Sequence, residues 1–180
     1  LRCKVVICPG IHSRDLTDRF VEQLRSASRR PLHPIVFCTQ QYPAYSGYHL
    51  LQVLDAWQAQ HGTLNRLSLI GFSAGVVAAA IAAWEWRRRG RAVNYLIALD
   101  GWGVPLYGDF PIYRVSHDRF TDWSSSLLGA GERRFFADPP VAHLDLWRSP
   151  QDVRGQAIDE TGETRSTTAL DCLVDWQSDC

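Results

Sequence analysis

The stretch Leu67-Ser68-Leu69-Ile70-Gly71-Phe72-Ser73-Ala74-Gly75 is an apolar run that ends in the pattern G-x-S-x-G, and an alanine-rich segment follows it at once. This order is typical of a buried strand, a tight turn and a helix. A serine on such a turn needs small neighbours, because the strand and the helix approach it closely, and two glycines supply that room. The pattern therefore predicts that Ser73 is a nucleophile held at the end of a strand.

The helix expected after Ser73 indicates the chemistry. The first N–H groups of a helix have no acceptor within it, so the N–H of Ala74 is placed to stabilise the oxyanion that forms when Ser73 attacks a carbonyl carbon. The motif thus predicts acyl transfer. The alternative is a glycine-rich turn with a bystander serine, since a pattern this short also occurs by chance.

Length and composition restrict the class of protein. At 180 residues the chain is long enough to fold as one domain, residues 1–180, and its 19 basic residues balance 19 acidic ones, which argues against a nucleic-acid partner. The five cysteines are odd in number and form no C-x-x-C pair, as expected for reduced thiols without a zinc site. No apolar stretch approaches the length of a membrane span. We therefore expect a soluble, cytoplasmic protein.

Apolar runs alternate with segments of helical periodicity along most of the chain. Strands are expected at residues 5–8, 35–38, 66–72 and 95–99, with helices between them and a fifth short strand at 134–137. The strands are nearly continuous apolar runs, which is typical of a parallel sheet covered on both faces. The sequence therefore predicts an α/β fold, a three-layer sandwich whose mostly parallel sheet has about five strands.

Two segments fit this alternation poorly. Residues 101–132 are dense in aromatic side chains and could form a lid or a substrate pocket, with Trp102 as the leading candidate; ordinary core packing is the alternative. The polar segment 151–180 is expected to be a weakly defined tail, apart from a possible helical turn at 169–176.

A serine nucleophile needs a base and a carboxylate that orients it, and in parallel sheets such groups stand at the carboxyl ends of strands. Asp100 ends the strand expected beside that of Ser73, although an ordinary Asp-Gly turn is the alternative. His143 follows the expected fifth strand and is the favoured base, with His117 as the alternative. Asp138 is a rival acid, but it leaves no room for a strand between itself and His143.

The oxyanion site needs a second N–H, usually from the loop after an early strand. The segment Pro9-Gly10-Ile11-His12 follows the first expected strand, so the N–H of Ile11 is the candidate and His12 could line the cleft. An ordinary strand-to-helix turn would explain this segment equally well.

With these residues in this order, the chain resembles the α/β-hydrolase superfamily, in particular its lipase-, esterase- and thioesterase-like members. The resemblance covers about residues 3–147 and depends on the elbow at 71–75, with serine, acid and histidine in the family order. It implies ester or thioester hydrolysis through an acyl-serine intermediate, with a small-molecule acyl substrate and with neither a metal nor an organic cofactor.

Two features depart from the family pattern. The chain starts at what would be the third strand of larger members, so it resembles a minimal version. The more usual acid follows one strand later than Asp100, which leaves the choice between Asp100 and Asp138 open. Two other functions also remain: a catalytically silent binding or scaffold protein of the same fold, and an acyltransferase. Nothing in the sequence indicates the oligomeric state.

Overall fold

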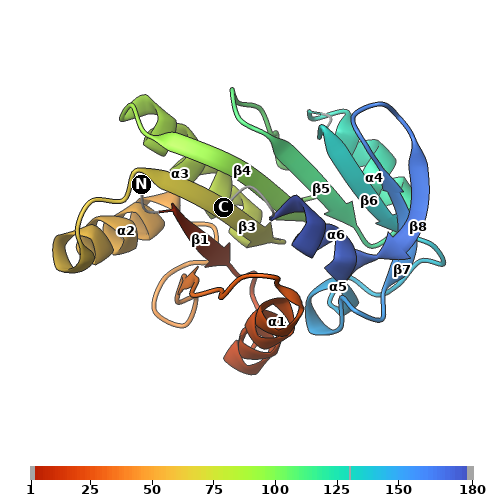
Figure 1. Cartoon of the computed structure of the whole chain (residues 1–180), viewed down its shortest axis with the longest axis horizontal. Helices are drawn as coiled ribbons and strands as arrows, with labels where there is room; N and C mark the ends of the chain where they lie inside the picture. The colour runs from red at the N-terminus through yellow and green to blue at the C-terminus, as the bar shows by residue number, and fades with distance from the viewer. Residues whose placement is uncertain (1–2, 130, 178–180) are drawn as a thin grey trace.

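The apolar runs of the sequence form the central strands of a single sheet. The computed structural model describes residues 3–129 and 131–177, and its strands follow the order β2-β1-β3-β4-β5-β6-β7-β8 across the sheet (Figure 1). Strands β2 to β6 are parallel, whereas β7 and β8 are antiparallel additions at one edge. The strands are β1 (Cys3–Cys8), β2 (Ile35–Val36), β3 (Arg66–Phe72), β4 (Ala92–Leu99), β5 (Ile112–Ser116), β6 (Arg133–Ala137), β7 (Arg154–Ile158) and β8 (Thr164–Thr168).

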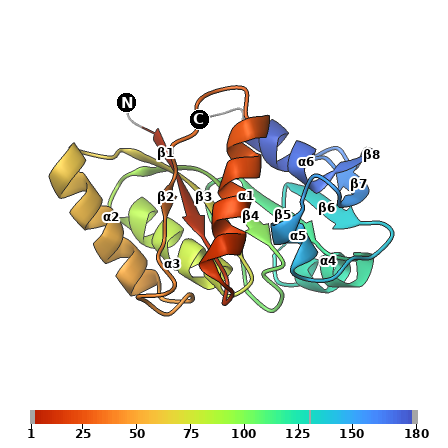
Figure 2. The ribbon, with the colours of Figure 1, turned by 90° about the horizontal axis from the view of Figure 1, so that it is seen from below.

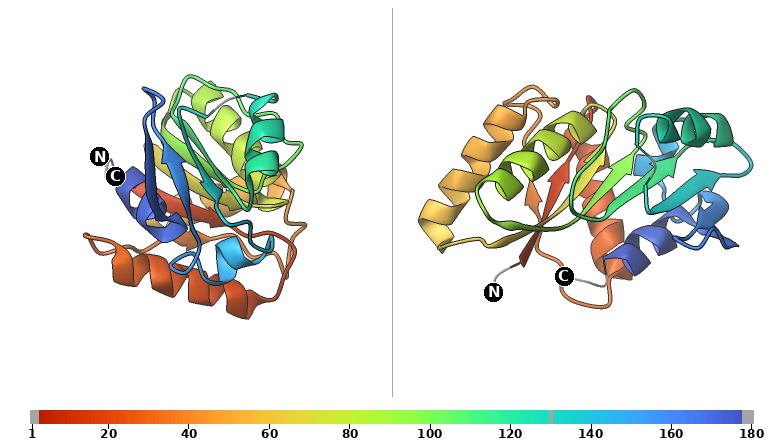
Figure 3. Two further views of the ribbon diagram at one scale, coloured as in Figure 1. Left: turned by 90° about the vertical axis from the view of Figure 1, so that its right-hand side faces the viewer. Right: turned by 90° about the horizontal axis from the view of Figure 1, so that it is seen from above.

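Helices cover both faces of the sheet, as the right-handed crossovers of parallel strands require. Helices α1 (Arg14–Ala27), α5 (Asp145–Arg148) and α6 (Ala169–Trp176) lie on one face (Figure 2). Helices α2 (Gly47–His61), α3 (Gly75–Arg88) and α4 (Arg119–Ser126) lie on the other (Figure 3). The α/β architecture with a mostly parallel sheet and helices on both faces is therefore confirmed.

Each face has its own apolar core. On the α1 side, the Phe20 ring stacks on Trp147 with 3.7 Å between the ring centroids, and both side chains are fully buried. On the α3 side, small alanines of α3 let the helix lie close to the strands, while Leu50 and Leu54 of α2 pack behind them. These two cores hold the central strands and therefore the positions of their carboxyl ends.

The expectation of about five strands was wrong, because three strands lack a readable apolar pattern. Strand β5 contains Arg114, which is buried and donates hydrogen bonds to the carbonyl groups of Gly129 and Leu128. A charged residue in a buried strand is satisfied only by the tertiary structure. Strands β7 and β8 form a polar antiparallel edge, with Thr164, Arg165 and Ser166 exposed, and α6 follows them, so residues 154–176 are structured rather than weakly defined.

Among the helices that the structure describes, none combines the length and apolar character needed to cross a membrane.

Candidate active site

Ser73 lies in the turn between β3 and α3. Its φ angle is 53°, in the left-handed region that residues other than glycine rarely adopt. The turn is tight enough that a Cβ on Gly71 would lie 2.8 Å from the Cα of Val76, and one on Gly75 would overlap the carbonyl oxygen of Cys8. The two glycines of the motif are therefore required by packing, and the strained turn holds Ser73 at the strand end.

Asp100 occupies the equivalent position at the end of β4, and its φ angle is 48°. Among the residues that the structure describes, Ser73 and Asp100 are the two non-glycine residues with a positive φ. The N–H of Ser73 donates to the carbonyl oxygen of Leu99 at 2.9 Å, and that of Asp100 donates to Val115 at 2.8 Å. The ends of β3, β4 and β5 are thus in register, which brings the two strained residues to one edge of the sheet.

Two histidines share the carboxylate of Asp100, whose side chain is only 2% exposed. The Nδ1 of His143 lies 2.7 Å from Oδ2 and the Nδ1 of His117 lies 2.8 Å from the same oxygen. The backbone N–H of His117 donates to the other oxygen, Oδ1, at 2.9 Å. An ionised carboxylate only accepts hydrogen bonds, so both rings carry a proton on Nδ1 in this arrangement. We call these three residues the Asp–His–His cluster.

The two histidines differ in what surrounds the rest of the ring. The His143 ring stacks on Phe72, the residue before the serine, with 4.7 Å between centroids. The Nε2 of His117 instead lies 3.5 Å from an oxygen of Asp118. His117 directly follows β5, whereas His143 lies in the loop after β6, which is joined to His117 by a hydrogen bond from the Val141 N–H to the His117 carbonyl oxygen. His143 therefore combines the bond to Asp100 with a position beside Ser73.

Asp118 has a structural task of its own. It caps helix α4, because its carboxylate accepts the Thr121 N–H at 2.6 Å. Burial by itself raises the pKa of Asp118, but the hydrogen bonds from Thr121 and the nearby His117 outweigh burial and hold that pKa below its usual value. Asp118 therefore stays ionised beside the cluster at neutral pH.

Ser73, Asp100 and both histidines of the cluster open into one cavity of about 530 Å³. No direct hydrogen bond joins the hydroxyl of Ser73 to either imidazole within the described part of the chain, and such bonds are often long in enzymes without substrate. The other lining residues are mostly apolar: Ala74, Val77, Trp102, Val104, Asp118, Phe120 and Thr121. A cavity with an apolar wall and convergent polar groups is the usual form of a small-molecule site.

The oxyanion candidates belong to two segments that adjoin the serine, the start of α3 and the loop after β1. Ala74 precedes α3 directly, so its N–H belongs to the unpaired first turn of that helix. The loop after β1 contacts the elbow, because a Cβ on Gly10 would lie 3.0 Å from the Cβ of Ser73. Ile11 follows Gly10 and its side chain is exposed to solvent.

Two residues suggested for the site by sequence lie elsewhere. His12 packs against both Phe72 and Trp147, with ring centroids 5.8 and 5.9 Å away, and does not line the cavity. Asp138 is exposed and borders a different hollow, beside β7 and β8. Trp102 does line the cavity, with 69% of its surface exposed.

Sequence reasoning expected a lid or pocket from residues 101–132 but did not predict helix α4, which provides one wall of the cavity. Phe120 and Thr121 contribute to it, and the shared use of Asp100 by both histidines was not expected. The available signal was Val115-Ser116-His117-Asp118, in which a histidine and an N-capping residue directly follow a short apolar run.

The Asp–His–His cluster also has the composition of a metal site. One carboxylate oxygen and two imidazole nitrogens lie within 4.8 Å of one another, and Zn²⁺ accepts such ligands. In the structure, Oδ2 of Asp100 accepts hydrogen bonds from Nδ1 of both rings.

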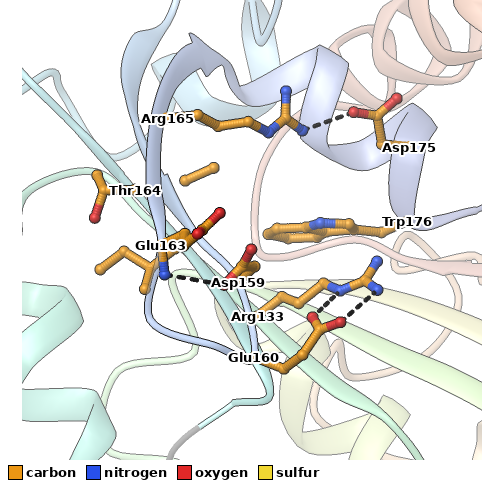
Figure 4. A pocket seen from close by; sticks show the side chains of 10 residues that line it. Arg133, Asp159, Glu160, Glu163, Thr164, Arg165, Asp175 and Trp176 are labelled. Atoms are coloured by element: carbon orange, nitrogen blue, oxygen red, sulfur yellow. Dashed lines mark hydrogen bonds and ion pairs between the residues drawn. The ribbon is translucent and has the colours of Figure 1, made fainter.

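A second hollow, of about 300 Å³, lies beside β7, β8 and α6 (Figure 4). Four of its charged side chains form two ion pairs: Arg133 donates to Glu160 at 2.8 Å and Arg165 donates to Asp175 at 2.7 Å. Trp176 forms one wall (Figure 4). The described residues that line this hollow include no serine, cysteine or histidine.

No protein-family model matches the chain, and a search of curated proteins finds no relative. A functional assignment therefore depends on the geometry of the site.

Proposed function

We propose that this protein is a serine hydrolase that cleaves an ester or thioester through an acyl intermediate on Ser73, and that it belongs to the α/β-hydrolase superfamily. The observation that carries the proposal is the coincidence at one sheet edge of a strained serine and a strained aspartate. His143 is bonded to that aspartate, stacks on Phe72, the residue before the serine, and lines the same cavity as Ser73. Backbone strain of this kind is retained where function requires it.

In the first half of the reaction, Nε2 of His143 accepts the hydroxyl proton while Oγ of Ser73 forms a bond to the substrate carbonyl carbon. Asp100 holds the His143 proton on Nδ1, so Nε2 keeps the lone pair that the transfer needs. The negative charge that develops on the carbonyl oxygen is stabilised by the N–H groups of Ala74 and Ile11. The carbon–oxygen or carbon–sulfur bond then breaks, and the imidazolium returns its proton to the leaving group.

In the second half, a water molecule gives a proton to Nε2 of His143 and its oxygen attacks the acyl carbon. The bond to Ser73 breaks, the serine regains its proton, and a carboxylic acid is released. If an alcohol or amine replaces the water, the same steps make the protein an acyltransferase. The open, mostly apolar cavity accommodates an acyl group next to Ser73 in either case.

His117 is not needed as a proton acceptor in this scheme. It donates to both oxygens of Asp100, from its backbone N–H and from its ring, and thereby fixes the carboxylate plane. We assign it the role of a positioning residue.

The test is covalent labelling with a fluorophosphonate, which requires an activated serine. We expect the wild type to be labelled and Ser73→Ala not to be labelled, and peptide mapping should find the adduct on Ser73. A well-folded wild type that resists labelling would favour the catalytically silent binding protein. Product analysis in the presence of added alcohols would then separate hydrolysis from acyl transfer in a protein that is labelled.

A further inference from the structure

Helix α4 buries polar side chains and exposes large apolar ones, which is the reverse of an ordinary surface helix. Its buried residues are polar, namely Thr121, Asp122 and Ser125, and Asp122 accepts a hydrogen bond from Arg134 of β6 at 2.8 Å. Its large apolar residues face solvent instead: Phe120 is 65% exposed, Trp123 58% and, at the end of the helix, Leu127 70%. Surface helices normally bury their apolar stripe, so an exposed one indicates a surface that binds something apolar.

The three apolar residues form a continuous strip. They are spaced three and four residues apart, which places them on the same side of the helix. The rings of Phe120 and Trp123 are in contact, with 5.8 Å between centroids. We call Phe120, Trp123 and Leu127 the α4 strip.

The α4 strip begins inside the candidate active site. Phe120 lines the same cavity as Ser73, together with Trp102 and Val104. The loop that carries Trp102 and Val104 is tied to the end of α4, because the N–H of Leu106 donates to the carbonyl oxygen of Leu128 at 2.9 Å. An apolar path therefore leads from the cavity at Ser73 outward along α4.

We propose that the α4 strip binds the acyl chain of the substrate, so that the protein acts on esters or thioesters of medium- to long-chain acids. This inference rests on the proposed hydrolase function and specifies its substrate class. From Phe120 to Leu127 the helix rises by roughly 10 Å. An extended chain covers that length with about eight bonds, at roughly 1.2 Å per bond.

The charges around α4 favour an uncharged chain over an anionic membrane surface as the occupant. Binding to anionic lipid requires lysines or arginines beside the apolar residues. The α4 strip itself has none, and the neighbouring Arg119 lies over the ring of Phe136, 6.0 Å from its centroid. Asp118 and Asp122 are the nearest acidic groups, and the first caps α4 while the second pairs with Arg134.

The experiment compares the rate of Ser73 labelling by alkyl fluorophosphonates of increasing chain length, which requires no turnover. Each methylene that leaves water on binding is expected to raise the second-order rate constant by about fourfold, until the chain passes the end of the strip. The double variant Trp123→Gln/Leu127→Gln changes only exposed side chains, so it should fold. We expect it to reduce the long-chain to short-chain rate ratio by at least about tenfold.

Tyr45→Gln is the matched control, because Tyr45 is also an exposed aromatic residue, at 58%, but does not line the cavity. It should leave the ratio unchanged. Labelling of Ser73 that is insensitive to chain length, or a ratio that the double variant does not alter, would overturn the acyl-chain assignment while leaving the hydrolase proposal intact. A double variant that keeps the ratio but dissociates an oligomer would instead identify the strip as a contact between copies of the chain. Absence of labelling by every probe would overturn the hydrolase proposal itself.

Discussion

Replacement of Asp100 by asparagine tests the proposed mechanism most directly, because the structure determines how the amide must orient. In the wild type, Oδ1 accepts the backbone N–H of His117, and Oδ2 accepts Nδ1–H of both histidines. The asparagine oxygen must stay at the Oδ1 position, since an NH2 group there would face the N–H of His117. The NH2 group then points at the two rings.

An amide that donates to Nδ1 of His143 forces the ring proton onto Nε2. His143 then has no lone pair with which to accept the proton of Ser73, so the base is present in the wrong tautomer. A loss of this kind lowers the rate of acylation by about 10⁴-fold, which corresponds to about 5.5 kcal/mol in the activation free energy. The volume of the side chain is unchanged, so we expect the variant to fold.

The assay is the second-order rate constant for fluorophosphonate labelling, measured alongside thermal unfolding. Asp138→Asn is the control, because Asp138 is the rival acid and lies outside the cavity of Ser73. We expect it to keep the wild-type rate. A folded Asp100→Asn protein whose labelling rate lies within tenfold of the wild-type rate would refute the role of Asp100. A large loss of labelling rate in Asp138→Asn would assign that role to Asp138.

Three further predictions concern the same site. His143→Gln should lower the labelling rate at least about 10³-fold, whereas His117→Gln should cost roughly tenfold to a hundredfold, and the reverse order would make His117 the base. Gly10→Ala should slow labelling about tenfold in a folded protein, because the added Cβ would lie 3.0 Å from the Cβ of Ser73, and an unchanged rate would show that the oxyanion loop moves freely. Added Zn²⁺ should inhibit labelling reversibly by occupying the Asp–His–His cluster, with recovery on chelation; inhibition that is equally strong in His117→Gln would place the metal elsewhere.

Residues near one another in the chain were sufficient to predict the elbow and much of the surrounding sheet. The strand Arg66–Phe72 has the predicted bounds, and helix α3, Gly75–Arg88, follows Ser73 as predicted. Local sequence suffices there because a buried parallel strand is a continuous apolar run, and because glycines mark the places where strand and helix approach.

The segments with a polar interior were not predictable in this way. Strand β5 contains the buried Arg114, and α4 buries Thr121, Asp122 and Ser125, so neither shows the apolar periodicity from which such elements are recognised. Their polar groups are satisfied by partners distant in sequence, as when Arg134 donates to Asp122. The sequence therefore indicated an irregular aromatic region where the structure has a strand and a helix.

For the site, the sequence by itself determined which strand end carries Ser73, the proposed nucleophile, and named Asp100, His143 and His117 as its candidate partners. Only the tertiary structure decided that both histidines bond to the same carboxylate, that Asp138 and His12 lie away from the cavity, and that α4 turns its apolar side outward. The physical reason is that a strained turn is encoded by adjacent residues, whereas a shared hydrogen-bond acceptor depends on where the ends of β4, β5 and β6 meet in space.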